Sequence, residues 1–435
     1  MKKQKIVLST LSTEGQFVNW TTQKHFTPKT VKYMPLGILS LASNIPDGHE
    51  IVILDPASEG WGIEETIQKI EAEKPDILGL SALTRRVYAL NEILKKTSAS
   101  YKVVGGPHAT YYADEILQKG ADAVFVGQLA DKEFAEAVET KPLGIINCKT
   151  DINEINFPRR HFLDIESYFV RGEDATVFES NKRLPIFSSV GCPRKCNYCN
   201  VQLRDKTRYK NPKTILDEME YLYSIDARSV HFFDDNFNSN SKNLKETLDE
   251  MEKRNFYVEW SGRGQVIMDL SLVERMVGNG FKRIHSGIEA LDDKLLKFWE
   301  KGQTVRQVEE FCKVMNKNNV EILGFFILGS PYPHETEEYR RILPQKIRDL
   351  GINYPYFSIL FPEPDTGYYR SLLRDGIYKE DHWAKFMKNP IRDFEIPYPY
   401  SEQKRKEVID YTNRIIEDFK KTNYKHREEL KNLKK

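Results

Sequence analysis

The chain has 435 residues, and its 65 lysines and arginines nearly balance its 64 aspartates and glutamates, giving a formal net charge of +1. This length suffices for two domains with full cores. The charge balance excludes a globally basic or acidic surface, so it gives no argument for a nucleic-acid or acidic-membrane partner. No apolar run is long enough to span a bilayer, the amino-terminal run is too short for a signal peptide, and five cysteines do not make a disulfide framework.

The first part of the chain, residues 1–140, alternates short apolar runs with amphipathic segments. The apolar runs predict strands at Lys5–Ser9, Ile51–Leu54, Ile77–Ser81, Lys102–Gly105 and Ala123–Val126. Between them, apolar residues recur at helical spacing, as in Ile63, Ile67 and Ile70. This alternation predicts a doubly wound, Rossmann-like α/β domain, in which ligands bind beyond the carboxyl ends of the strands.

Three of the four segments expected at those strand ends contain glycines, which let a backbone approach a bulky ligand closely. We interpret four of them as loops: MPLGILSLA (Met34–Ala42), SALTRR (Ser81–Arg86), GGPHAT (Gly105–Thr110) and GQLADKEF (Gly127–Phe134). Each of them alone would equally suit a response-regulator-like or nucleotide-binding domain.

Periodicity fades in residues 141–184, where prolines and aromatics predict an ordered connecting segment. The strand-helix alternation returns in residues 185–370. Strands are predicted at Ile186–Val190, Ser229–Phe233, Tyr257–Trp260, Arg283–Ile288, Ile322–Leu328 and Tyr354–Leu360. Six such units predict a partial (β/α)6 barrel of the TIM type, with active residues at the carboxyl ends of its strands. Residues 371–435 are expected to form a small helical region.

The most informative stretch follows the first strand of this barrel. Three cysteines stand there with three and then two residues between them, at Cys192, Cys196 and Cys199, and Tyr198 precedes the last. Three thiolates on so short a loop can converge on one metal centre. A closed zinc site wants four ligands, whereas three cysteines on a cubane cluster leave one iron without a protein ligand.

The two remaining cysteines do not supply a convincing fourth zinc ligand. Cys312 lies on a helical stripe with Val308 and Met315 and is expected in the core, while Cys148 is isolated. From the spacing alone, a zinc site, a disulfide with one spare thiol and unrelated surface cysteines stay as alternatives to an iron-sulfur cluster.

The cysteine loop resembles that of the radical S-adenosylmethionine (radical SAM) superfamily. The resemblance implies a 4Fe-4S cluster whose open iron binds SAM, and a reductive cleavage that yields a 5′-deoxyadenosyl radical. Placed before such a barrel, the amino-terminal loops resemble the cobalamin-binding domain of cobalamin-dependent radical SAM enzymes, many of which are methyltransferases. The resemblance runs from Lys5 to about Arg370.

Segments after the later barrel strands resemble the family's SAM-binding segments. The implied SAM contacts are Tyr198, Asp234, Asp235, Asn236, Arg263, Glu289, Gly324 and Gly329. Alternation along a strand places His285, Gly287 and Glu289 on one face. His285 is therefore a candidate substrate-binding or proton-handling group, and a packed or solvated histidine is the alternative.

The amino-terminal loops imply a second set of contacts, to cobalamin. These are Ser81, Leu83, Thr84, Arg85, Gly106, Pro107, His108, Gly127 and Gln128. The sequence lacks the D-x-H-x-x-G signature that carries an axial histidine, and GQLA at Gly127–Ala130 stands where the family often has GEGE. The resemblance therefore predicts cobalamin bound without an axial histidine, and His108 either contacts the corrin or is an ordinary loop histidine.

By this resemblance the protein uses a 5′-deoxyadenosyl radical and methylcobalamin to methylate an unactivated carbon. The alternatives are a cyclase or rearrangement enzyme that uses cobalamin without methyl transfer, and, in another class, a non-catalytic cobalamin- or SAM-binding module. The expected partners are a small-molecule or peptide substrate and an electron donor such as flavodoxin or ferredoxin. An oxygen-labile cluster belongs in a reducing compartment, so we expect a cytoplasmic protein.

Overall fold

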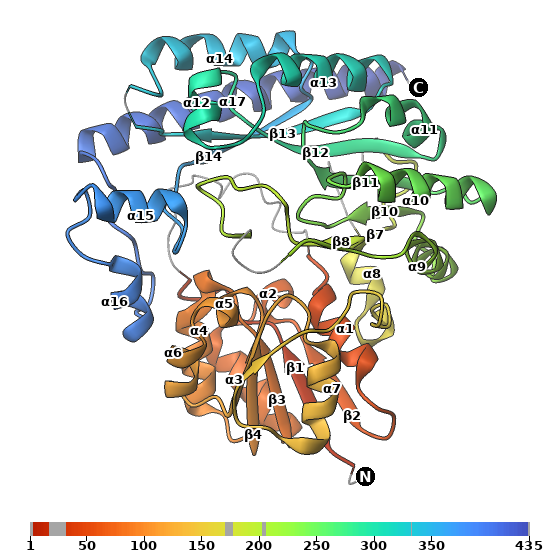
Figure 1. Cartoon of the computed structure of the whole chain (residues 1–435), viewed down its shortest axis with the longest axis vertical. Helices are drawn as coiled ribbons and strands as arrows, with labels where there is room; N and C mark the ends of the chain where they lie inside the picture. The colour runs from red at the N-terminus through yellow and green to blue at the C-terminus, as the bar shows by residue number, and fades with distance from the viewer. Residues whose placement is uncertain (1–2, 17–31, 170–176, 202–205, 332, 434–435) are drawn as a thin grey trace.

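The computed structural model describes residues 3–16, 32–169, 177–201, 206–331 and 333–433, with the side chains of its last helix described only to residue 421. Residues 170–176 of the expected connecting segment lie outside the described part. Two parallel sheets lie one above the other, and the cysteine loop runs between them (Figure 1).

The lower sheet has six parallel strands in the order β2-β1-β3-β4-β5-β6. They are β1 (Lys5–Ser9), β2 (Glu50–Leu54), β3 (Ile77–Ser81), β4 (Tyr101–Gly105), β5 (Ala123–Val126) and β6 (Gly144–Asn147). Its helices are α1 (Leu36–Asn44), α2 (Pro56–Glu59), α3 (Ile63–Glu73), α4 (Val87–Lys96), α5 (Pro107–Tyr111), α6 (Ala113–Gln118) and α7 (Asp131–Thr140). The doubly wound α/β domain is confirmed.

Several parts of this domain differ from expectation. The predicted loops Ser81–Arg86, Gly105–Thr110 and Gly127–Phe134 are partly helical, since Thr84–Arg86 form a 3-10 helix, α5 begins at Pro107 and α7 begins at Asp131. The segment Met34–Ala42 is not a loop, because Leu36–Asn44 form α1. Most of that helix is buried, including Ser40 and Ser43, so it shows no clear polar face by which its sequence would reveal it. The sheet also continues beyond residue 140: β6 lies at its edge, with every second residue of Gly144–Asn147 exposed.

The upper sheet is the predicted partial barrel, with six parallel strands in the order β14-β13-β12-β11-β10-β7. They are β7 (Arg183–Ile186), β10 (Ser229–Phe232), β11 (Glu259–Gly264), β12 (Phe281–Glu289), β13 (Glu321–Leu328) and β14 (Tyr354–Ile359). The expected first strand, Ile186–Val190, is divided: β7 ends at Ile186, and β8 (Ser189–Val190) pairs antiparallel with β9 (Arg208–Tyr209).

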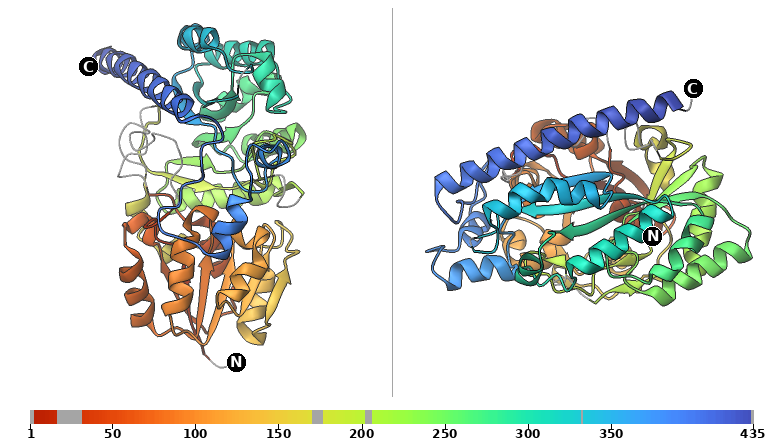
Figure 2. Two further views of the ribbon diagram at one scale, coloured as in Figure 1. Left: turned by 90° about the vertical axis from the view of Figure 1, so that its left-hand side faces the viewer. Right: turned by 90° about the horizontal axis from the view of Figure 1, so that it is seen from above.

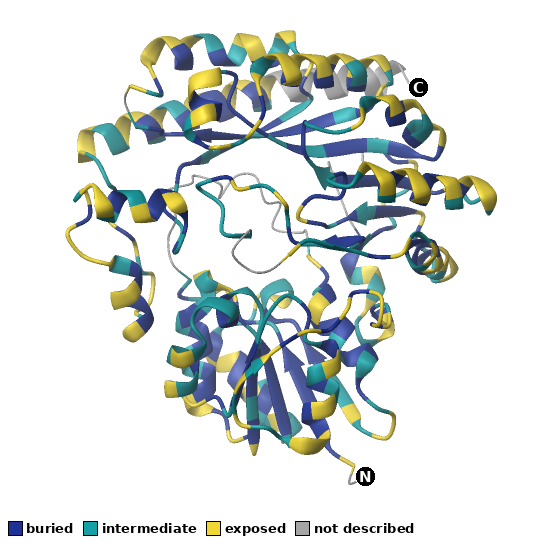
Figure 3. Ribbon diagram, in the orientation of Figure 1, coloured by how far each residue is buried: buried dark blue, intermediate teal, exposed yellow. Residues whose placement is uncertain are grey.

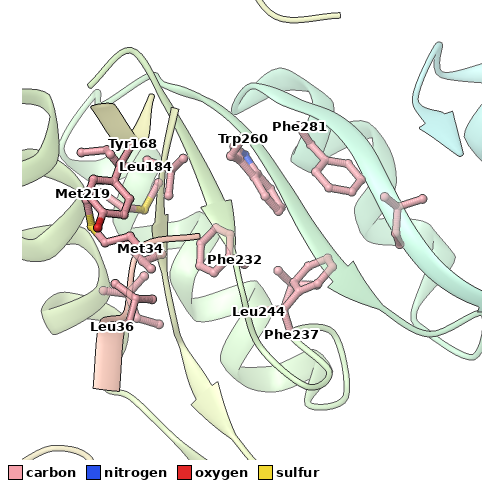
Figure 4. Close-up of a cluster of buried hydrophobic side chains, with 14 of the residues drawn as sticks. Met34, Leu36, Tyr168, Leu184, Met219, Phe232, Phe237, Leu244, Trp260 and Phe281 are labelled. Atoms are coloured by element: carbon pink, nitrogen blue, oxygen red, sulfur yellow. The ribbon is translucent and has the colours of Figure 1, made fainter. Parts of the chain in front are cut away.

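Helices cover the outer face of this barrel (Figure 1). They are α9 (Pro212–Ser224), α10 (Ser241–Lys253), α11 (Val273–Gly278), α12 (Asp293–Phe298), α13 (Val305–Lys317) and α14 (Glu337–Asp349). On β10 and the strands beside it, alternate side chains face these helices. Phe232, Trp260 and Phe281 are among them and form an aromatic cluster (Figure 4). Cys312 is buried in the same core, as its helical stripe predicts.

The two domains share buried surface. Met34 and Leu36, at the start of α1, lie beside Leu184 and Met219 of the barrel in one continuous apolar cluster (Figure 4). Figure 3 shows the buried strands of both sheets and the exposed outer faces of their helices. This shared apolar cluster stabilises the contact between the domains, because each square ångström of apolar surface removed from water contributes about 25 cal/mol to the free energy of folding.

The connecting segment, which includes α8 (Ile165–Tyr168), is anchored by a buried ion network. Arg160 donates to Pro185 O at 2.8 Å and to Glu218 Oε1 at 2.7 Å, and Lys210 donates to Glu218 Oε2 at 2.8 Å. Although burial opposes it, Lys210 and Arg160 lower the pKa of Glu218. The carboxylate thus joins the connecting segment to α9 and β9.

The carboxyl-terminal region also reaches both domains. It comprises α15 (Gly367–Arg374), α16 (His382–Lys388) and α17 (Glu402–Leu433), of which α17 lies across the barrel (Figure 2). Beside α16, Arg392 pairs with Glu14 at 2.6 Å, and Lys119 donates to Lys388 O at 2.7 Å. Within the described part of the chain, every helix is too short or too polar to cross a membrane.

Candidate active site

The cysteine loop lies between the two sheets, and its middle residue, Asn197, bonds to two backbone carbonyls of the barrel. Asn197 N donates to Trp299 O at 3.1 Å, and Asn197 Nδ2 donates to Phe298 O at 2.6 Å. Burial raises the pKa of Cys199 to about 11, and the other two cysteine thiols add to the shift. All three thiols are free of disulfide bonds.

These thiols fit an iron-sulfur cluster in number and chemistry. Among the described residues, no three His, Cys, Asp or Glu side chains are close enough to share one metal ion. A cubane requires a wider arrangement, since each thiolate binds a different iron. Beside the loop, Asn236 Nδ2 lies 3.6 Å from Cys192 Sγ. The side-chain oxygens of Asn197 and Asn236 are buried without a hydrogen-bond partner, which suits a bound polar molecule.

Asp234 holds the strand end that leads into the loop. Its carboxylate accepts from Ser188 N at 2.8 Å, from Ser188 Oγ at 2.6 Å and from Ser189 Oγ at 2.6 Å. Burial raises its pKa to about 6 against the effect of these bonds. The neighbouring Asp235 is exposed and accepts from Gly191 N at 3.1 Å. Asp234 therefore positions the strand end before the loop, while Asp235 and Asn236 contact the loop itself at Gly191 and Cys192.

Tyr198 of the cysteine loop forms a polar group with Glu289 and Lys301. Lys301 Nζ donates to Glu289 Oε1 at 2.8 Å and to Tyr198 Oη at 3.3 Å. Glu289 has a positive φ of 64°, at a bulge where β12 ends. Lys301 was not predicted from the sequence, because it lies beyond α12 and no pattern links it to β12.

The two glycines expected at SAM have packing explanations of their own. A Cβ on Gly324 would lie 2.9 Å from Ile288 Cδ1, so this glycine lets β13 pack closely against the helix-covered side of the barrel. Gly329 has φ +86°, and its Cβ would lie 3.0 Å from Val408 of α17. The backbone conformation at Gly329 therefore requires glycine, whereas a Cβ at Gly324 would have to displace the end of the Ile288 side chain.

His285 and Arg263 lie on the inner face of the barrel, as alternation predicts. They are register partners on β11 and β12, and His285 packs against His231 of β10 with ring centres 4.8 Å apart. His231 Nδ1 lies 2.8 Å from Ser261 Oγ. Burial lowers the pKa of both imidazoles well below the usual range, so both are neutral near pH 7.

The amino-terminal domain has a pocket at the carboxyl ends of its strands, with about 730 Å³ of empty space, part of it open to solvent. Of the expected cobalamin contacts, Ser81, Gly106, Gly127 and Gln128 line it. The pocket wall also includes residues that were not named individually from the sequence. Ile38, Ser40 and Asp131 lie within the predicted segments Met34–Ala42 and Gly127–Phe134, whereas Leu8, Gly79 and Phe125 lie within strands and were missed.

The pocket wall has features that fit cobalamin. Gly106 has φ +97°, and a Cβ there would lie 3.0 Å from Ala82 O, so the backbone can run close to a ligand. Both side-chain polar atoms of Gln128 are buried and unpartnered. Cobalamin offers amide groups that could satisfy them, together with a flat aromatic base at the end of its nucleotide tail, which suits the apolar part of the lining.

Other expected cobalamin contacts lie outside the pocket lining. His108 is buried, its Nδ1 lies 3.3 Å from Thr84 Oγ1, and its ring stacks on Tyr112 at 5.0 Å. Burial lowers its pKa to about 3. Arg85 lies 4.0 Å from Glu363 of the barrel, and Leu83 is partly exposed. Leu83, Thr84 and Pro107 belong to the same loops but are not part of the pocket wall.

The two sites meet at one contact. A Cβ placed on Gly191, the residue before Cys192, would lie 2.7 Å from Gln128 Nε2. Nearby, Tyr111 Oη donates to Asn200 O at 2.7 Å, just after the cysteine loop. The rim of the pocket therefore touches the loop that carries the three thiols.

Comparison with known proteins agrees with this geometry. Residues 186–343 match the Radical SAM superfamily, and residues 30–135 match the B12 binding domain. The chain is 25% identical over 382 residues to an uncharacterized methyltransferase of Pyrococcus horikoshii, over 81% of each chain. It is 24% identical over 377 residues to the bacteriochlorophyllide d C-8(2)-methyltransferase of Chlorobaculum tepidum, over 82% of this chain and 80% of that protein.

Two further proteins are informative. An anaerobic magnesium-protoporphyrin IX monomethyl ester cyclase of Rubrivivax gelatinosus is 23% identical over 362 residues, which cover 74% of this chain and 63% of the cyclase. The radical SAM methyltransferase TsrM of Kitasatospora setae, solved with cobalamin and a 4Fe-4S cluster, superposes with a TM-score of 0.62 at 16% identity, over 86% of this chain and 75% of TsrM. The latter likeness shows the shared fold.

The two matched domains imply the cofactors: a 4Fe-4S cluster and SAM for the first, and cobalamin for the second. The chain therefore joins a B12 binding domain to a radical SAM domain, the combination of the cobalamin-dependent radical SAM enzymes, and methyltransferases are among its relatives.

Proposed function

We propose that this enzyme methylates an unactivated carbon of a small-molecule or peptide substrate held between its two domains. The contact between Gln128 and Gly191 carries this proposal, since it brings the rim of the cobalamin-side pocket against the cysteine loop. A reaction that uses both cofactors on one substrate needs them close together and shielded from water. When bound, the cluster supplies the electron that cleaves SAM, and cobalamin carries the methyl group.

The residues of the chain have distinct parts in this scheme. Cys192, Cys196 and Cys199 hold the cluster, and Asp234 fixes the strand end that precedes them. Asn236, with an unpartnered side-chain oxygen, can accept from the ammonium group of SAM. Each of these roles rests on placement beside the loop.

The polar group of Tyr198, Glu289 and Lys301 includes a residue of the cysteine loop itself. We assign it to the remaining polar groups of SAM, because a paired lysine and glutamate offer both a donor and an acceptor there. On the cobalamin side, Ser81, Gly106, Gly127 and Gln128 form the wall. His108 is held by Thr84 and Tyr112 away from that wall, which favours cobalamin without an axial histidine.

The test is anaerobic reconstitution of the full chain with iron, sulfide and hydroxocobalamin, followed by metal counting and mass analysis of SAM products under reductant. We expect about four irons and one cobalt, with 5′-deoxyadenosine and S-adenosylhomocysteine both formed. Iron and 5′-deoxyadenosine without cobalt would refute the methyl-transfer scheme. Metal binding without any SAM cleavage would instead favour a non-catalytic binding module.

A cyclase is the second candidate, favoured by the similarity to the Rubrivivax gelatinosus protein. Cobalt and 5′-deoxyadenosine without S-adenosylhomocysteine would support it. In either case the reductant in the cell would be a flavodoxin or ferredoxin, and the oxygen-labile cluster favours the cytoplasm. Reduction of the reconstituted cluster by a purified flavodoxin, followed by electron paramagnetic resonance, tests the electron donor.

A further inference from the structure

The inner face of the barrel carries a basic group that the scheme above does not use. Val230, Phe232 and Ile284 pack under the outer helices, so His231 and His285 point to the opposite face. Arg263 is the register partner of His285, and its guanidinium lies 3.7 Å from the ring centre of Phe233. The inner face thus carries two neutral imidazoles and the cation of Arg263, while Arg283, on the same face of β12, is paired with Glu321.

Arg263 differs from the other well-buried arginines. Arg160 pairs with Glu218 at 2.7 Å, Arg340 with Glu335 at 2.5 Å and Arg283 with Glu321 at 2.8 Å. In the described part of the chain, the guanidinium of Arg263 has no ion pair or hydrogen bond.

The carboxylates that influence Arg263 are already engaged elsewhere. Asp234 is bound by Ser188 and Ser189, and Asp235 accepts from Gly191 N. Burial lowers the pKa of Arg263, which reflects the cost of keeping its charge in this place. Asp234 and Asp235 act on Arg263 only through space, so this partly buried cation has no directly ion-paired carboxylate and favours an anionic ligand.

His285 contributes a second polar atom to the inner face of the barrel beside Arg263. His285 Nε2 is buried and has no hydrogen-bond partner. His231, in contrast, contacts Ser261, and its position fixes the adjacent imidazole through ring packing. In its Nε2–H tautomer, the neutral ring of His285 can donate one hydrogen bond, which together with the unpaired guanidinium of Arg263 matches the two oxygens of a carboxylate.

Aromatic rings on the same face would contact the rest of such a ligand. Phe233 lies under Arg263, and Phe325 and Tyr356 are register partners on β13 and β14 with ring centres 5.9 Å apart. All three are partly exposed. Aromatic side chains favour flat, apolar ligands, which they bind by stacking or edge contacts.

We propose that Arg263 and His285 bind the carboxylate of an aromatic or otherwise conjugated organic acid, which is the substrate. This proposal rests on the function proposed above. A single carboxylate is favoured over a phosphate because one unpaired guanidinium and neutral imidazoles balance one negative charge. The resemblance assigned Arg263 to SAM, whereas here it is a substrate-binding residue.

The probe is sodium benzoate, with benzamide as its neutral match, added to the full reconstituted protein labelled with ¹⁵N-histidine. We expect benzoate, and not benzamide, to shift the signals of His231 and His285 in a saturable way, with assignments from His231→Gln and His285→Gln. Arg263→Gln should weaken benzoate binding at least about tenfold, as expected for a hydrogen bond to a charged group, while Arg263→Lys recovers part of it. Arg306→Gln, on the exposed side of α13, is the matched control.

Two outcomes overturn the proposal. The first is that benzoate and benzamide act alike, or that neither shifts the two histidines. The second is that Arg263→Gln weakens SAM binding about tenfold while benzoate binding persists, which would return Arg263 to SAM. Benzoate binding needs no turnover, so it can fail or succeed independently of the metal counts and 5′-deoxyadenosine that test the proposed function.

Discussion

Gln128 and Gly191 touch across the boundary between the two domains: a Cβ on Gly191 would lie 2.7 Å from Gln128 Nε2. Gly191 also has φ +83°, a conformation that residues with a side chain rarely adopt. It occupies the turn between β8 and Cys192. The geometry of the cysteine loop therefore depends on Gly191 having no side chain, because a Cβ there would be strained and would contact Gln128.

Replacing Gly191 with alanine should both strain the loop and displace Gln128. We expect Gly191→Ala to lower the free energy of unfolding by about 1–3 kcal/mol and to reduce iron content after reconstitution. Gly278→Ala is the control, because a Cβ there meets nothing within 4 Å. Adding Gln128→Ala should restore part of the iron content. If both glycine variants take up iron equally, the contact does not matter to the loop.

Cys196→Ala tests the iron-sulfur cluster independently of cobalamin binding. We expect it to abolish 5′-deoxyadenosine formation and to leave cobalt binding largely intact, because the pocket lies in the other domain. The control is Cys312→Ala, which removes a buried thiol of the barrel core and should keep the cluster. Undiminished 5′-deoxyadenosine from Cys196→Ala would contradict the cluster assignment.

Much of this architecture was predictable because buried parallel strands appear in the sequence as continuous apolar runs. Ile77–Ser81 and Ala123–Val126 were predicted to the residue. The edge strand β6 was missed because half of Gly144–Asn147 is exposed, and α1 was missed because it is largely buried. Hydrophobic periodicity identifies elements with one clearly buried face. It fails for an edge strand with little buried surface, such as β6, and for a helix that is buried on most sides, such as α1.

The candidate site was predictable only where its residues are close in sequence. The spacing of Cys192, Cys196 and Cys199 was visible at once. The pairing of Lys301 with Glu289 depends on how the chain returns after α12, and the adjacency of Arg263 and His285 depends on the register of two strands. Neither relation leaves a local pattern in the chain.

The buried carboxylate of Glu218 gives a prediction about stability. Glu218→Gln leaves Arg160 and Lys210 without their negative partner, so we expect a loss of about 3–5 kcal/mol in the free energy of unfolding. Glu220→Gln, in the same helix and exposed, should change it by less than about 0.5 kcal/mol. Urea unfolding at pH 7 measures both variants. Equal stability would mean that the network does not hold the connecting segment.

The same carboxylate predicts how stability depends on pH. The folded-state pKa of Glu218 is lowered from 4.5, so the folded protein holds this proton less tightly than the unfolded chain. Its stabilisation is therefore complete above about pH 4.5 and is lost as the pH falls through the lower folded-state pKa. Unfolding curves between pH 3 and 7 should show a steeper acid loss for the wild type than for Glu218→Gln. Parallel curves would contradict this reasoning.

Lys301 offers a test of the SAM side of the site. Its ammonium group bonds to Glu289 and Tyr198, and its side chain is only 12% exposed. Lys301→Met would leave Glu289 unpaired at a backbone position with φ 64°. We expect the KM for SAM to rise about tenfold or more, as for the loss of a charged hydrogen bond, with iron content unchanged.

A conservative variant separates binding from folding at this position. Lys301→Arg keeps the positive charge and should recover part of the affinity for SAM, whereas Lys294→Met, exposed on α12, should behave like the wild type. A purely structural ion pair would give a different pattern. Lys301→Met would then lower the melting temperature while its KM for SAM stayed the same, and the assignment of Lys301 and Glu289 to SAM would be wrong.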